Sequence, residues 1–163
     1  MKRIFRFGIA FALLIGVLAG CANPGAIALN TTADELVKKL GKPTDTRPNP
    51  QGGEFWDYVY GPEGVATWRY AIDNNRTVRS ADQLLTHERL YRVVPGVTTE
   101  AGVLDLLGRP RLVTRFRNEA AWEWRADLSP NTGIFIVRFS HDGLALGVGV
   151  IMDASIDGDS SPP

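Results

Sequence analysis

Residues 96–110 read Gly-Val-Thr-Thr-Glu-Ala-Gly-Val-Leu-Asp-Leu-Leu-Gly-Arg-Pro, and a variant of this segment occurs earlier in the chain. The earlier copy, residues 31–43, reads Thr-Thr-Ala-Asp-Glu-Leu-Val-Lys-Lys-Leu-Gly-Lys-Pro. At an offset of 67 residues the copies share a threonine pair, a leucine, the glycine after it and a proline. Such a repeat predicts two tandem structural units.

Each copy predicts a short helix with a defined start and end. A threonine caps the start, and Thr32 with Glu35 forms the pattern of a capping box. Apolar residues follow at helical spacing. Gly41 and Gly108 then supply the positive φ that ends a helix, and a proline two positions later prevents the helix from resuming.

Strands are expected after each helix. In the first copy residues 55–60 and 67–73 alternate around a Gly-Pro-Glu-Gly turn, and a third strand is predicted over 77–85. The second copy repeats this order, with predicted strands at 120–125, 134–140 and 144–151. The fold class is therefore α+β, with two tandem repeats, each a short helix packed on a three-stranded antiparallel sheet.

The segments between these elements complete the predicted organisation. Residues 47–53 are a loop, and residues 111–116 are a lead-in or a short strand. The first repeat covers 31–85, and a linker covers 86–95, where a helical turn with Leu90 and Val93 packing is expected. The second repeat covers 96–152, and an acidic Ser/Gly/Pro-rich tail, predicted to be disordered, covers 153–163. In 144–151 the small residues on one face predict that another element, most simply a helix, packs close to them.

The first 21 residues resemble a bacterial lipoprotein signal. A basic start precedes twelve mostly apolar residues, fewer than the roughly 20 that span a bilayer. The segment ends in Leu18-Ala19-Gly20-Cys21, which resembles the lipobox. That resemblance implies a signal peptide over 1–20, diacylglyceryl and acyl chains on Cys21, and a flexible lipidated tether over 21–30. The alternative is an ordinary signal peptide with a chance cysteine.

Composition after cleavage favours an envelope protein that does not bind nucleic acid. Removing residues 1–20 takes away three of 18 basic residues, which leaves 15 against 18 acidic residues and a net charge of −3. Nucleic-acid binding depends on neutralising phosphates, so this balance argues against it. Cys21 is the only cysteine, and its lipidation would leave no thiol for a disulfide or for catalysis. Apart from that covalent lipid, no cofactor is expected.

The second copy, followed by Trp-Glu-Trp at 122–124 and an Asp-Gly turn at 142–143, resembles the SmpA/OmlA (BamE-like) domain of outer-membrane lipoproteins. The first copy keeps Thr-Thr, Leu-Gly-Lys-Pro and Trp-Asp-Tyr, although Leu29-Asn30 stands where the family has Pro-Gly. A doubled arrangement also resembles the β-lactamase-inhibitor-protein fold. These resemblances imply helices on one face of antiparallel sheet, an outer-membrane anchor facing the periplasm, and binding of other envelope proteins.

No catalytic or metal-binding set emerges from the residues. The two histidines, His87 and His141, lack metal-ligand spacing with each other or with acidic residues. Ser140-His141-Asp142 has triad residue types, but adjacent strand residues point to opposite faces. Six acidic residues could supply a carboxylate pair, as chance alone would allow: Glu54, Asp57, Glu63, Glu119, Glu123 and Asp127. The chain is therefore predicted not to be an enzyme.

Aromatic residues recur at equivalent strand positions in both copies. They form either the core between helix and sheet or an exposed platform for a partner protein. The candidate partner-binding residues are Trp56, Tyr58, Trp68, Tyr70, Trp122 and Trp124. The favoured function is a non-enzymatic outer-membrane lipoprotein that supports envelope assembly or integrity. The alternative is a periplasmic enzyme inhibitor or ligand-binding protein that uses an aromatic sheet face.

Overall fold

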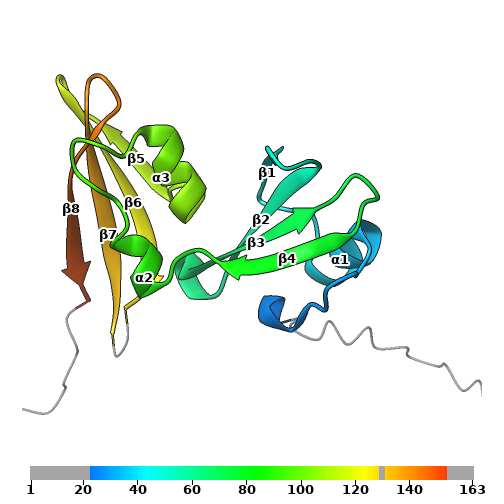
Figure 1. The fold of residues 1–163 in the computed structure, drawn as a ribbon. Helices are drawn as coiled ribbons and strands as arrows, with labels where there is room; N and C mark the ends of the chain where they lie inside the picture. The colour runs from blue at the N-terminus through cyan, green and yellow to red at the C-terminus, as the bar shows by residue number, and fades with distance from the viewer. Residues whose placement is uncertain (1–22, 129–130, 154–163) are drawn as a thin grey trace, which may run out of the picture.

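The computed structural model describes residues 23–128 and 131–153, which form two α+β halves lying side by side (Figure 1). The predicted signal peptide, the lipobox with Cys21, and residues 154–163 of the predicted tail lie outside the described residues. Within the described ranges, no helix has the length and apolar character needed to cross a bilayer.

Each half contains a four-stranded antiparallel sheet with helices on one face. The first sheet has the order β1-β2-β3-β4 and the second has the order β5-β6-β7-β8. The first half comprises η1 (Pro24–Ala26), α1 (Ala33–Leu40), β1 (Asp45–Pro48), β2 (Glu54–Tyr60), η2 (Pro62–Gly64), β3 (Ala66–Ile72) and β4 (Val78–Gln83). The second comprises α2 (His87–Leu90), α3 (Glu100–Leu107), β5 (Leu112–Arg115), β6 (Glu119–Asp127), β7 (Thr132–Ser140) and β8 (Ala145–Met152).

The prediction of three strands in each sheet was wrong by one strand. The additional strands are β1, which begins before the predicted loop at 47–53, and β5, which is the short strand that was one of the two alternatives for residues 111–116. Each is four residues long and pairs only with the next strand along the chain. A run this short shows too little alternation to stand out in the sequence.

The helix boundaries follow from caps that the repeat encodes. The Thr32 hydroxyl accepts from the backbone N–H of Glu35, whose carboxylate accepts from the Thr32 N–H, so the capping box is confirmed. Thr99 caps α3 through the N–H of Gly102. Gly41 and Gly108 end the helices at φ 82° and 73°, with ψ near −167° in both. That region of backbone space is open almost only to glycine.

The aromatic strands form the two cores. In the first half α1 covers Trp56, Tyr58 and Tyr70 on the inner face of the sheet. In the second half α2 and α3 cover Trp122, Trp124 and the buried residues of β7. Burial of this apolar surface is the main force that stabilises each half.

One connecting segment is more ordered than predicted. Residues 23–30 were expected to be a free tether, but Pro24 and Ile27 are buried against the first core. The Tyr70 hydroxyl donates to the Pro24 carbonyl at 2.7 Å, which fixes this segment to the sheet.

The helical turn predicted within the linker 86–95 is confirmed as α2. Leu90 and Val93 pack in the second core, so this segment forms part of the second half.

The small face of β8 is not covered by a helix. A methyl group placed at Gly147 or Gly149 would meet no atom within 4 Å. The predicted close packing on these glycines is therefore absent from the described part of the chain. Both helices of the second half lie on the opposite face, because Phe135, Val137 and Phe139 present a larger apolar surface there.

Candidate functional site

An ion-pair network occupies the outer face of the first sheet. Asp57 and Arg69 are directly opposed on β2 and β3, on the face away from α1. Arg69 donates from Nε and Nη2 to the two carboxylate oxygens of Asp57, each at 2.7 Å. Asp57 is 2% exposed and Arg69 is 6% exposed. Arg47 on β1 adds a second guanidinium, 3.8 Å from Asp57. The paired geometry satisfies the buried carboxylate.

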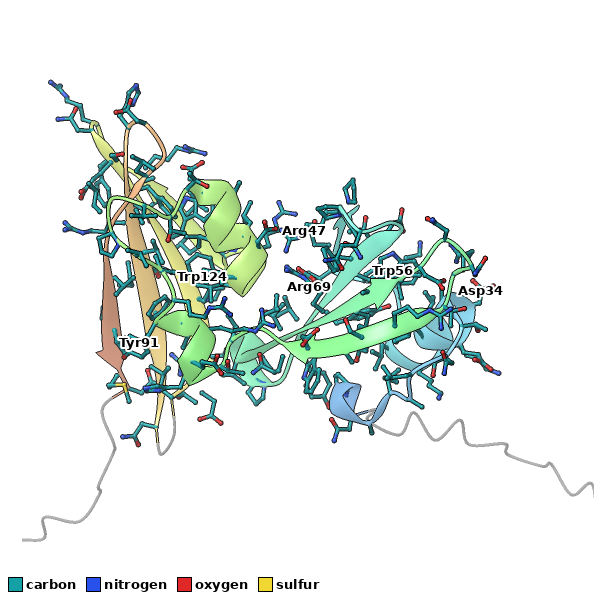
Figure 2. All side chains as sticks on the ribbon, in the orientation of Figure 1. Asp34, Arg47, Trp56, Arg69, Tyr91 and Trp124 are labelled. Atoms are coloured by element: carbon teal, nitrogen blue, oxygen red, sulfur yellow. The ribbon has the colours of Figure 1, made fainter. Side chains whose placement is uncertain are left out.

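The two arginines bind the carboxyl-terminal end of α3. Arg69 donates to the carbonyl of Asp105 at 2.7 Å, and Arg47 donates to the carbonyl of Leu104 at the same distance. Arg47 also pairs with the Asp105 carboxylate at 3.0 Å. The last carbonyls of a helix lack intrahelical partners and carry partial negative charge, so cations are stabilising there. Figure 2 shows both arginines extending from the first sheet toward α3. The network therefore joins the two halves.

Burial and charge act in opposite directions on Asp57. Removal from water raises the pKa of this carboxyl group, whereas the Arg47 guanidinium lowers it. The bidentate contact with Arg69 also favours the ionised form. Because guanidinium groups bind both of its carboxylate oxygens, Asp57 helps to join the halves. It is not placed to act as an acid or base on a ligand.

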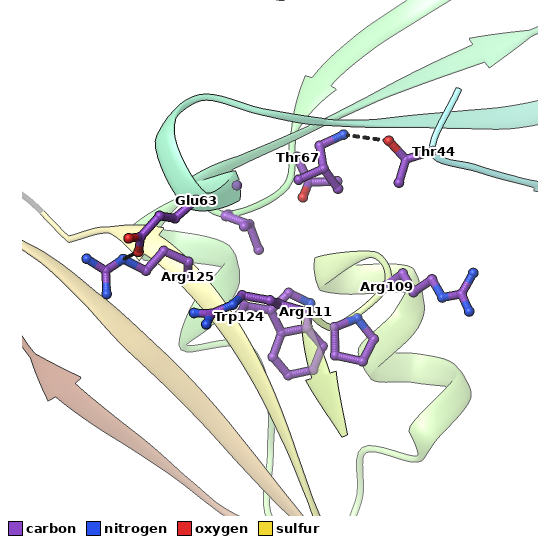
Figure 3. Close-up of a pocket in the computed structure, with 11 residues that line it drawn as sticks. Thr44, Glu63, Thr67, Arg109, Arg111, Trp124 and Arg125 are labelled. Atoms are coloured by element: carbon purple, nitrogen blue, oxygen red, sulfur yellow. Dashed lines mark hydrogen bonds and ion pairs between the residues drawn. The ribbon is translucent and has the colours of Figure 1, made fainter. Parts of the chain in front are cut away.

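A cavity of about 310 Å³, which we term the central cavity, opens beside this network between the halves. Its apolar surface comes mainly from Val59, Leu85, Pro110 and Trp124. Figure 3 shows Thr44 and Thr67 on one wall, facing Trp124 and Arg111 on the other. The remaining lining residues are Glu63, Gly64, Arg109 and Arg125. A cavity of this size lies at the lower end of the range for ligand sites.

The cations around the central cavity differ in their partners. Arg125 is held by Glu63 at 3.3 Å and by the Asp153 carboxylate. Arg109 and Arg111, in contrast, have no side-chain hydrogen bond or ion pair to any residue that the structure describes. In Figure 3 Arg111 lies beside Trp124, whereas Arg109 extends outward. The cavity therefore combines apolar walls with an unpaired guanidinium.

The six predicted partner-binding aromatics do not form an exposed platform. Trp56, Tyr58, Tyr70, Trp122 and Trp124 are buried, and Trp68 packs against the first core with Gly25 of η1 against its indole ring. The platform prediction is thus corrected in favour of core. The reason is that α1, η1, α2 and α3 all cover the aromatic faces. Trp124 alone among the six lines the central cavity.

Arg47 and Arg69 are not among the site residues predicted from the sequence, and Asp57 is only one of several unassigned carboxylates there. The available signal was a charged residue inside each aromatic strand, Trp-Asp-Tyr on β2 and Trp-Arg-Tyr on β3. Since alternation places both on the same face, a cross-strand ion pair was predictable. The contact with α3 was not.

Among the other candidate polar residues, Glu63 lines the central cavity, whereas the two histidines and Glu119 lie apart from it. His87 and His141 are exposed, and the His87 ring contacts Tyr91 with the ring centroids 4.8 Å apart. Glu119 pairs with Arg138 at the far end of the second sheet. Within residues 23–128 and 131–153, His, Cys, Asp and Glu form no group of three or more suited to a metal ion.

Comparison with protein-family models gives no match, and comparison with curated proteins gives none either. The SmpA/OmlA resemblance therefore stays a prediction. Among solved structures, a "putative beta-lactamase inhibitor protein" from Streptococcus mutans is 13% identical, with TM-score 0.36 over 78% of this chain and 86% of that chain. A DUF4309 family protein (YjgB) from Bacillus subtilis is 17% identical, with TM-score 0.27 over 75% and 78%.

A third structure, an extracellular protein containing an SCP domain from Bacillus anthracis, is 15% identical, with TM-score 0.31 over 78% of this chain and 45% of that chain. At these identities and TM-scores, the three structures do not establish a shared fold or function.

Proposed function

We propose that this chain is a non-enzymatic lipoprotein, anchored through Cys21 to the periplasmic face of the outer membrane, that binds another envelope protein. The observation that carries the binding proposal is the central cavity, where apolar walls meet the unpaired guanidinium of Arg111. The ligand that complements this cavity is a short protein segment in which an apolar side chain stands next to a carboxylate.

Two interactions would stabilise the bound segment: burial of its apolar side chain and pairing of its carboxylate with Arg111. Val59 and Pro110 offer apolar surface to a side chain that leaves water, which contributes roughly 25 cal/mol per Å² buried. Arg111 would pair with the adjacent carboxylate, and a guanidinium binds a carboxylate in a fixed bidentate geometry. Residues of this kind, aromatic and arginine around a small pocket, commonly dominate binding energy at protein interfaces.

The joined halves would hold the site ready for its partner. The contacts of Arg47 and Arg69 with α3 fix the spacing of the two walls, because the walls belong to different halves. A pre-formed site loses less conformational entropy on binding. The same pre-formed site would suit an accessory of envelope assembly or an inhibitor of a periplasmic enzyme. The identity of the partner distinguishes these two functions.

Photo-cross-linking in the native envelope tests the proposal. Val59 lines the central cavity and is 45% exposed, whereas Val94 is 49% exposed and is not among the cavity residues. A benzophenone amino acid at position 59 should capture a partner protein, and the same group at position 94 should not. Mass spectrometry of the adduct names the partner.

A charge reversal provides the second arm of this experiment. Arg111→Glu in the position-59 background should abolish the adduct, because it repels a partner carboxylate. Arg115→Glu is the matched control, since Arg115 lies on β5 outside the central cavity. Equal adducts from positions 59 and 94, or an adduct that survives Arg111→Glu, would show that the cavity is not the binding site.

A further inference from the structure

One edge strand of the second sheet differs from the other three edge strands of the protein. β1 and β5 are four residues long, and β1 contains Pro48. β4 carries the charged residues Arg79 and Asp82. Short length, charge and proline are the usual devices that prevent an exposed edge from pairing with another chain. β8 has eight residues, Ala-Leu-Gly-Val-Gly-Val-Ile-Met, and has none of these devices.

The side chains along β8 are exposed although they are apolar. Ile151 is 57% exposed, Leu146 is 47% exposed and Met152 is 43% exposed. Gly147 and Gly149 leave open space on the outer face of the strand, since nothing lies within 4 Å of a methyl group placed there. Figure 1 shows β8 at the margin of its half, beyond β7. The strand therefore presents an uncharged apolar ribbon with gaps at the glycines.

The backbone of β8 is unpaired on its outer side from Val148 onward. Asp153 donates its N–H to the Thr132 carbonyl of β7, and hydrogen-bonded pairs alternate along antiparallel strands. Val148, Val150 and Met152 therefore direct their N–H and C=O groups away from β7. Among the described residues, β8 pairs with no strand except β7.

The start of β8 is covered. The Ala145 N–H donates to the Thr98 carbonyl, and the Ala145 carbonyl accepts from Gly96 at 2.7 Å. The segment before α3 thus closes the edge there, and the register shift between Arg138 and Phe139 separates that region from the open part. The open edge of β8 therefore begins at Val148, and its outward N–H and C=O groups are centred on Val150.

We propose that the open edge of β8 pairs antiparallel with β8 of a second copy of this chain, so that two second sheets form one continuous eight-stranded sheet. With the two-fold axis at Val150, Val148 faces Met152 of the other copy and Gly149 faces Ile151. The outward N–H and C=O groups of Val148, Val150 and Met152 then become hydrogen-bonded. This isologous arrangement closes after two copies.

Charge and shape both favour a second copy as the occupant. A strand without charged residues meets its own copy without bringing any charge into the seam, whereas such pairing at β4 would bring Arg79 and Asp82 there. Each Ile151 side chain would cover the open space above Gly149 of the other copy. The large and the small side chains of the strand therefore complement each other under two-fold symmetry. This surface is separate from the central cavity, so the pairing does not depend on the proposed function.

Sedimentation equilibrium of the full chain in density-matched detergent tests the proposal. The wild type should sediment with the protein mass of a dimer at tens of micromolar. The Val148→Lys variant should sediment as a monomer, because each copy would place a lysine charge in the apolar seam, opposite Met152 of the other copy. Val113→Lys is the matched control on β5, at the opposite edge of the same sheet, since Val113 is 39% and Val148 is 38% exposed. The control should remain a dimer.

A cross-linking measurement keeps the result independent of detergent. Gly149→Cys, treated in membranes with a short bismaleimide, should give an adduct of two copies that is lost when Val148→Lys is added. The parent chain, with Cys21 as its only cysteine, gives the background. A monomeric wild type, equal behaviour of Val148→Lys and Val113→Lys, or a cross-link only to a different protein would each overturn the proposal.

Discussion

Replacement of Arg69 by methionine tests whether the Asp57–Arg69 pair joins the two halves. The variant keeps an unbranched side chain of similar length but removes the guanidinium. It leaves the Asp57 carboxylate, which is 2% exposed, without its bidentate partner, and it leaves the Asp105 carbonyl without its donor at 2.7 Å. Arg47 remains 3.8 Å from Asp57 and still donates to Leu104.

The expected loss of unfolding free energy is about 4 kcal/mol, because removal of one partner of a buried ion pair costs about 3–5 kcal/mol. The double variant Asp57→Leu, Arg69→Met should lose only about 2 kcal/mol. It no longer buries an unpaired charge, and its remaining cost is mainly the unsatisfied Asp105 carbonyl, worth about 1–3 kcal/mol. The single change should therefore be more damaging than the double change.

Urea unfolding of the wild type, both single variants and the double variant measures this coupling. Urea is preferred because it leaves the ionic strength unchanged, and salt weakens ion pairs. Trp56 and Trp68 lie in the first half and Trp122 and Trp124 lie in the second, so a variant that keeps only one tryptophan pair follows one half alone. In the Arg69→Met variant the two halves should unfold at more widely separated urea concentrations than in the wild type.

Two outcomes would refute this reasoning. If Arg69→Met costs less than about 1 kcal/mol, the pair contributes no more than an exposed salt bridge. If the double variant is as unstable as Arg69→Met, the cost does not come from a stranded buried carboxylate.

Three further predictions concern the helix ends and the membrane anchor. Gly108→Val should lower the melting temperature by more than Gly147→Val. Gly108 has positive φ, and a Cβ placed there would lie 3.2 Å from Thr67 and Leu84, whereas a Cβ at Gly147 would meet open space; equal shifts would contradict this. Thr32→Ala should cost about 1 kcal/mol in urea unfolding at pH 7. Because the hydrogen bonds from Thr32 lower the pKa of Glu35, the difference should shrink as the pH falls below 4.5. Cys21→Ala should abolish labelling with radioactive palmitate and release the protein from membranes, and labelling that persists would disprove the lipobox prediction.

The features that depend on local conformation are predictable from the amino-acid sequence alone. The offset of 67 residues gave the number of units, and Thr32, Gly41, Thr99 and Gly108 placed the helix ends, because a cap and a positive φ are properties of a few adjacent residues. Alternation also located the longer strands, since a strand with one face buried repeats every two residues. The aromatic stripes were visible for the same reason.

The neighbours of each helix and sheet face, in contrast, are known only from the folded chain. The sequence left the aromatic residues open as core or platform, and the helices and η1 resolved this by covering them. The contacts of Arg47 and Arg69 with α3 span 57 and 36 residues of chain, so no local pattern predicts them. The central cavity and the open edge of β8 arise in the same way. Each depends on which segments distant in sequence meet in space, and periodicity defines a face without defining its neighbour.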